Sequence, residues 1–145
     1  MKSRNLAIIF CVAVACLLTL SGCKVTGGGW LASASEGKAN FGFVLQDCDE
    51  AKGQFTYIDM AAGVKVKGEL ISFIGDHLAS VSYRSTNPQD PGEGIAEVYF
   101  ADTGEGNDDH GFLQIAVLTG PFQGYFNAGL IDGGNIQEHE CPAED

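Results

Sequence analysis

The chain has 145 residues, of which 19 are aspartate or glutamate and 8 are lysine or arginine, so its formal net charge is −11 at pH 7. An acidic surface of this kind repels nucleic acid and anionic headgroups. The composition therefore argues against direct binding of DNA or RNA, and against membrane binding through a basic face. The length fits one domain with a hydrophobic core.

The first residues have the pattern of an export signal. Lys2 and Arg4 make a positive start, and residues 6–20 form an apolar run that suits a signal sequence but is short for a bilayer span. The small residues Ser21 and Gly22 follow, as a cleavage pocket requires. We expect segment 1–22 to be a signal peptide, with an uncleaved membrane anchor as the alternative.

The tetrapeptide Leu20-Ser21-Gly22-Cys23 resembles the lipobox of bacterial lipoprotein precursors. The resemblance implies that Cys23 becomes the first residue of the mature protein, receives a diacylglyceryl group on sulfur and is acylated on its amino group. Two or more acyl chains attach a protein stably, since each buried methylene contributes about 0.8 kcal/mol. Because Lys24 and not aspartate follows, the resemblance also implies the outer membrane of a Gram-negative cell.

The remaining cysteines predict one disulfide bond. Cys11 and Cys16 leave with the signal peptide and Cys23 takes the lipid, so Cys48 and Cys141 remain. An even pair in an exported chain indicates a disulfide, because the space beyond the inner membrane is oxidising. The bond would close a loop that spans 93 residues, which stabilises the fold by about 4–5 kcal/mol in the chain-entropy model. Metal ligation by the two thiols is the rival interpretation.

The mature part, residues 23–145, is expected to be an all-β domain. Apolar residues alternate with polar residues or glycine at a period of two, which is typical of half-buried strands. Glycine- and proline-containing turns separate the strands, and little helix is expected. The predicted strands are 39–45, 55–58, 64–70, 79–83, 96–100, 113–117, 122–127 and 135–139. About eight short strands at this spacing predict a single antiparallel barrel or sandwich.

Glycines refine this prediction. We interpret residues 27–29 as a turn with positive φ that places the Trp30 indole in the core at one end of the barrel, with a ligand-stacking surface as the alternative. Residues 133–134 are interpreted as a hairpin turn, and a change of phase suggests a bulge near Gly68 or a segment covered on both faces. If the barrel closes through its first and last strands, Cys48 and Cys141 can meet at one end.

Several short motifs together resemble the post-COAP domain of bacterial secreted and surface proteins. The resemblance implies an all-β extracellular domain without an assigned biochemical role and without catalytic residues to transfer. The chain departs from the pattern in Glu138 and Glu140 around His139, and in the loop at 104–107. The motifs are Val25-Thr26-Gly27-Gly28-Gly29-Trp30, Gly37-Lys38-Ala39-Asn40-Phe41-Gly42-Phe43, Tyr57-Ile58-Asp59 and Gly133-Gly134-Asn135-Ile136-Gln137.

An acidic, glycine-containing segment at 102–109 is the best candidate for a metal site. Its carboxylates belong to Asp102, Glu105, Asp108 and Asp109. Carboxylate oxygens are the hard ligands that Ca²⁺ prefers, and the glycines let backbone carbonyls join them. The spacing is not that of an EF-hand. A solvated acidic loop without metal is the alternative interpretation.

Enzymatic activity is not expected. The chain has no GxSxG elbow and no HExxH motif. His77, His110 and His139 each follow an acidic residue and can pair with it at the surface; a transition-metal cluster would require that all three converge. The many carboxylates alone do not indicate a glycosidase pair.

Three functional hypotheses follow. The first is a lipid-anchored module of the cell envelope that binds an envelope partner or helps to organise the envelope. The second is a β-barrel lipoprotein that carries a small ligand in its interior, and the third, less favoured, is a hydrolase with acids or histidines in a cleft. The carrier hypothesis rests on aromatic residues that can line a cavity: Phe41, Phe43, Phe55, Tyr57, Tyr83, Tyr99, Phe100, Phe122, Tyr125 and Phe126.

Overall fold

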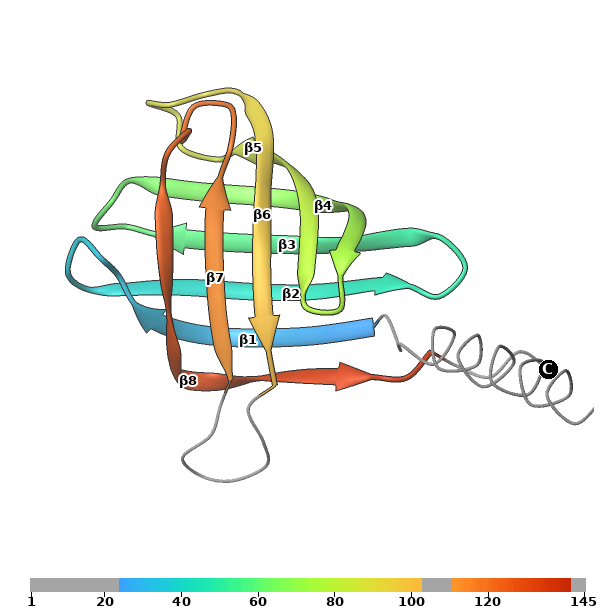
Figure 1. Cartoon of the computed structure of the whole chain (residues 1–145). Coiled ribbons are helices and arrows are strands. Elements are labelled where there is room, and N and C mark those ends of the chain that lie inside the picture. The colour runs from blue at the N-terminus through green and yellow to red at the C-terminus, as the bar shows by residue number, and fades with distance from the viewer. Residues whose placement is uncertain (1–23, 103–110, 142–145) are drawn as a thin grey trace, which may run out of the picture.

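The computed structural model describes residues 24–102 and 111–141, and eight β-strands form a closed barrel in that part of the chain (Figure 1). Among these residues, no helix is long and apolar enough to cross a membrane. The expected all-β antiparallel barrel is confirmed. The strands are β1 (Lys24–Ala32), β2 (Lys38–Asp47), β3 (Ala51–Asp59), β4 (Val64–Gly75), β5 (Leu78–Ser85), β6 (Glu93–Ala101), β7 (Phe112–Val117) and β8 (Phe126–His139).

Each strand pairs in antiparallel fashion with the next one along the chain, and β8 pairs with β1 to close the barrel. In Figure 1, β1, β2 and β3 lie across the view while β6 and β7 run nearly at right angles to them. The N-terminal mouth is formed by Lys24, residues 48–50, residues 76–77 and Cys141. The far mouth is formed by residues 33–37, 60–63, 86–92 and 118–125.

Aromatic side chains fill the interior. The Phe43 ring lies 6.1 Å from the rings of both Phe55 and Phe100, measured between centroids, and Phe55 stacks on Tyr57 at 6.3 Å. All four residues are buried. The alternation within each strand produces this core, because one set of side chains points inward and the other outward. An eight-stranded barrel has an interior just wide enough for such side chains.

The glycine-rich segment at 27–29 belongs to strand β1, so the prediction of a turn there is wrong, and so is the prediction of a hairpin at 133–134 inside β8. Gly29 and Gly134 are paired across the seam and both have positive φ. A Cβ atom at Gly134 would overlap the carbonyl oxygen of Gly28. These glycines therefore allow the backbones of the first and last strands to approach closely.

Two further details bear on the sequence-based expectation. Trp30 lies half-buried on the outer wall and not in the core, where Gly133 leaves room for its indole and the Lys38 ammonium lies 3.9 Å from the ring centroid. The irregularity predicted near Gly68 lies two residues further on, between Leu70 and Ser72. Gly68 keeps its regular inward position, where a Cβ would lie 3.0 Å from the backbone oxygen of Ser82.

The predicted disulfide is confirmed. Cys48 follows β2 and Cys141 follows β8, and their Cα atoms lie 5.5 Å apart. Both strands flank β1, so the bond joins the two neighbours of the first strand at the N-terminal mouth. The barrel is thus cross-linked next to the seam at which it closes.

We predict that Gly134→Ala lowers the free energy of unfolding by about 3 kcal/mol or more, because the new methyl group meets backbone across the seam at a positive φ. Gly28→Ala is the matched control. It lies one strand away, and its Cβ would have no neighbour nearer than 3.9 Å. Urea denaturation of the two variants measures the difference. Equal stabilities would contradict a closely packed glycine seam.

Candidate functional site

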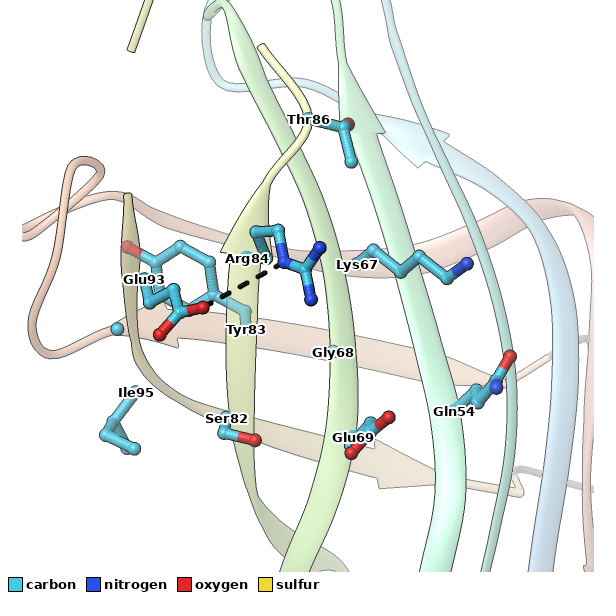
Figure 2. Close-up of a pocket in the computed structure, with 11 residues that line it drawn as sticks. Gln54, Lys67, Gly68, Glu69, Ser82, Tyr83, Arg84, Thr86, Glu93 and Ile95 are labelled. Carbon is cyan, nitrogen blue, oxygen red and sulfur yellow. Dashed lines mark ion pairs between the residues drawn. The ribbon is translucent and has the colours of Figure 1, made fainter. Parts of the chain in front are cut away.

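The outer wall of the barrel carries a hollow of about 650 Å³ over strands β3 to β6 (Figure 2). Outward-pointing residues of four neighbouring strands supply its side chains. Figure 2 shows them arranged around the backbone of Gly68, with Lys67 and Arg84 on one side and Glu69 and Ser82 on the other. The side chains that line the hollow include Gln54, Lys67, Glu69, Ser82, Arg84 and Glu93.

The register places two positive charges side by side in this hollow. Lys67 of β4 is the direct cross-strand partner of Arg84 of β5. Like charges in this position destabilise a sheet. Arg84 has one acidic neighbour, Glu93, with Nε and Oε1 4.0 Å apart, but both side chains are more than three-quarters exposed and such a pair contributes little. Lys67 makes no ion pair within 4.0 Å among the residues that the structure describes.

The hollow continues around the wall. A second hollow shares Gln54 and Glu69 with it and extends to Gly42 on β2. A third shares Val44 with the second and reaches Asn135 and Gln137 on β8. We call these three neighbouring hollows together, from Glu93 on β6 to Gln137 on β8, the wall groove.

Glycines line the second and third hollows of the wall groove. Gly28 of β1 and Gly42 of β2 are cross-strand partners on the outer wall. Neither needs positive φ, and a Cβ at either position would make only ordinary contacts, at 3.9 and 3.5 Å. Backbone is therefore exposed where side chains would otherwise fill the groove. Fold constraints do not explain the absence of side chains at these two positions.

A second polar cluster lies inside the far mouth, around a buried carboxylate. Asp59, at the end of β3, is 1% exposed. Its Oδ2 accepts hydrogen bonds from the Ser33 and Tyr125 hydroxyls, each at 2.6 Å, and its Oδ1 accepts one from the Ala62 amide at 3.2 Å. A buried carboxylate requires such partners. Asp59 therefore holds three loops of the far mouth together.

Hydroxyl groups extend this cluster into the core. Asn127 donates to the Tyr57 hydroxyl at 2.9 Å, and the Tyr57 and Tyr125 oxygens are 2.7 Å apart. Because Tyr125 gives its single proton to Asp59, Tyr57 must donate to Tyr125. Burial, followed by the hydrogen bond to Asp59, raises the pKa of Tyr125 above its usual range, and burial likewise raises the pKa of Tyr57.

The N-terminal mouth holds a smaller hollow of about 480 Å³. Phe73 and Phe100 line it together with His77 and Glu138. The Nδ1 atom of His77 lies 2.6 Å from Oε1 of Glu138. The pairing of His77 with a distant acid, and not with its neighbour Asp76, depends on the approach of the last strand and is not visible in the sequence.

The predicted site residues have different outcomes. Cys48 and Cys141 are bonded as expected. Cys23 and three of the four candidate calcium ligands, Glu105, Asp108 and Asp109, lie outside the described residues, as does His110. Asp102 follows β6 at the N-terminal mouth. Within the described residues no three His, Cys, Asp or Glu side chains are grouped as metal ligands, and the calcium site stays a prediction.

In the described part of the chain His77 and His139 have different partners; His110 lies outside that part, so a cluster of all three histidines stays a prediction. His77 contacts Glu138, and His139 Nε2 lies 2.9 Å from the Thr26 hydroxyl.

The pair of Lys67 and Arg84 in the wall groove was not predicted from the sequence. Its signal was partly present, since Lys65 and Lys67 alternate with inward residues, but the pairing with Arg84 needs the register between strands.

Comparison of the sequence with protein-family models and with curated proteins, and of the fold with solved structures, finds no match. The similarity to the lipobox and to the post-COAP domain therefore stays a prediction from the residues. Function has to be argued from the geometry of this barrel.

We predict that Tyr57 and Tyr125 do not ionise near pH 10, the ordinary value for tyrosine, while the barrel is folded. Wild type and Tyr57→Phe/Tyr125→Phe should then give the same tyrosinate absorbance until unfolding begins. The raised pKa values stabilise the fold fully below about pH 10, and that contribution is lost as the pH rises further, because only the unfolded state then releases these protons. An extra absorbance rise near pH 10 in folded wild type would contradict the buried cluster.

Proposed function

We propose that the protein is a lipid-anchored module of the bacterial cell envelope that acts by binding, through the outer wall of its barrel. The filled interior carries this proposal. Since Phe43, Phe55, Phe100 and Tyr57 occupy the space in which a barrel lipoprotein would hold a ligand, the wall groove is the larger surface available for recognition.

The start of β1 supports attachment through Cys23. The strand begins at Lys24, directly after the cysteine, so a lipid on Cys23 would hold the N-terminal mouth close to the membrane without a spacer. Asp47, Asp49, Glu50 and Asp76 lie at or near that mouth. Because these acids repel anionic headgroups, attachment would depend on the acyl chains and not on charge.

The two rival hypotheses have less support. A small-ligand carrier would have to use the hollow at the N-terminal mouth, which Phe73 and Phe100 line beside His77. A hydrolase would have to use His77 and Glu138 at the N-terminal mouth, since the Asp59 carboxylate is buried and accepts three hydrogen bonds. We therefore propose binding without catalysis, and the outer membrane as the location because Lys24 follows Cys23.

Metabolic labelling tests the anchor. We expect the full chain, expressed in a Gram-negative host, to incorporate radiolabelled palmitate, and Cys23→Ser to abolish the label. Cys16→Ser, a matched change within the apolar part of the signal peptide, should keep it. Retention of label in Cys23→Ser, or recovery of the wild type in the aqueous phase of a detergent partition, would refute lipid anchoring at this residue.

A further inference from the structure

We propose that the wall groove binds an acidic oligosaccharide, a chain of sugars that carry carboxylate groups. The inference rests on the proposed function in one respect, namely that the outer wall is the binding surface. It names the chemistry of the ligand and the residues that recognise it. Three properties of the groove lead to it: its charge, its hydrogen-bonding side chains and its length.

The charge of the groove is opposite to that of the chain. Lys52, Lys67 and Arg84 line it, which is half of the six basic residues that follow Cys23. Glu69 and Glu93 are its acidic lining residues, in a chain with 19 acids. An anion between Lys67 and Arg84 would relieve the repulsion between these cross-strand neighbours. The Arg84 guanidinium suits a carboxylate, which it can bind through two parallel hydrogen bonds.

Glu69 distinguishes a sugar from other anions. It lies on the same face of β4 as Lys67, two residues further on, and Figure 2 shows it across the Gly68 backbone from the cationic pair. A ligand that fits both groups must present a negative group to Lys67 and Arg84 and a hydrogen-bond donor to Glu69. One uronic acid unit carries a carboxylate and several hydroxyls. A phosphate ion or a purely anionic polymer would be repelled by Glu69.

Apart from apolar residues such as Val44, Leu70 and Ile95, the rest of the lining is typical of hydroxyl recognition. Uncharged amide and hydroxyl side chains can both donate and accept hydrogen bonds, as sugar hydroxyls require. Strands β5, β3, β2, β1 and β8 each contribute at least one such side chain to the groove. The residues are Ser82 on β5, Gln54 and Thr56 on β3, Gln46 on β2, Thr26 on β1, and Asn135 and Gln137 on β8.

The groove is long enough for several sugar units. From Arg84 on β5 to Gly28 on β1 it crosses four inter-strand steps, about 19 Å at the usual strand spacing. The exposed backbone at Gly28 and Gly42 lets a chain lie flat there. A ligand bound at the cationic pair should therefore gain affinity when it is extended toward β1.

Titration calorimetry on the full-chain protein, purified in detergent, tests the chemistry. We expect binding of hexagalacturonate that weakens with salt, and no binding of neutral maltohexaose. Lys67→Gln and Arg84→Gln should each weaken binding about tenfold, the usual effect of losing one charged hydrogen bond. Lys65→Gln is the matched control, because Lys65 lies on the same strand and face but outside the groove.

A steric variant tests the length. Gly42→Phe adds a side chain on the groove floor, where a Cβ makes an ordinary contact at 3.5 Å, so the thermal midpoint should stay unchanged. Hexagalacturonate should lose its advantage over digalacturonate in this variant, while digalacturonate binds as before. The same outcome with Gly28→Phe would support the path of the groove.

Three results would overturn the inference: no binding of hexagalacturonate, equal binding of poly-glutamate or inorganic phosphate, or affinities that do not respond to Lys67→Gln and Arg84→Gln. The labelling of Cys23 is independent of all three. A protein that incorporates palmitate but binds no acidic sugar would refute this inference and leave lipid anchoring intact.

Discussion

The close approach of β1 and β8 at their glycines is the constraint on which the rest of the structure depends. Gly29 and Gly134 lie opposite each other, both with positive φ, where a side chain would meet backbone. This contact closes the barrel and removes the two free edges that a sheet would otherwise expose. The bond between Cys48 and Cys141 then joins the two neighbours of β1, so the seam is closed by backbone fit and by a covalent link.

Closure at eight strands determines where recognition can occur. The interior of such a barrel is filled by aromatic rings, and the far mouth is sealed by the hydrogen bonds of Asp59, Tyr57 and Tyr125. A polar cluster that is fully satisfied makes a mouth rigid, since separating its members would leave a buried carboxylate without partners. Under the proposed function a ligand would therefore bind on the outer wall, where side chains can vary without loss of the core.

The sequence predicted the fold better than the candidate site. Alternation at a period of two located most strands, because this signal lies in neighbouring residues. Cysteine counting found the disulfide, because elimination of the other cysteines left one pair. The glycine-rich strands β1 and β8 were misread, since glycine is compatible with turns and with strands that pack closely. The pair of Lys67 and Arg84 depends on register, which sequence alone does not show. Asp59 is in phase with Phe55 and Tyr57, and this was a usable signal for a buried carboxylate.

The distribution of charge and the direction of the strands together define an orientation. With a lipid on Cys23, the acidic N-terminal mouth would face the membrane, and the strands would rise from it. In that attachment the wall groove, which crosses the strands, would lie on the side of the barrel and not at the mouth that faces the membrane. Its basic residues lie on the wall, and several acids lie at the mouth. An anionic chain would then be repelled from the mouth and attracted to the wall, which favours a polymer that lies along the envelope surface over one that enters the barrel end.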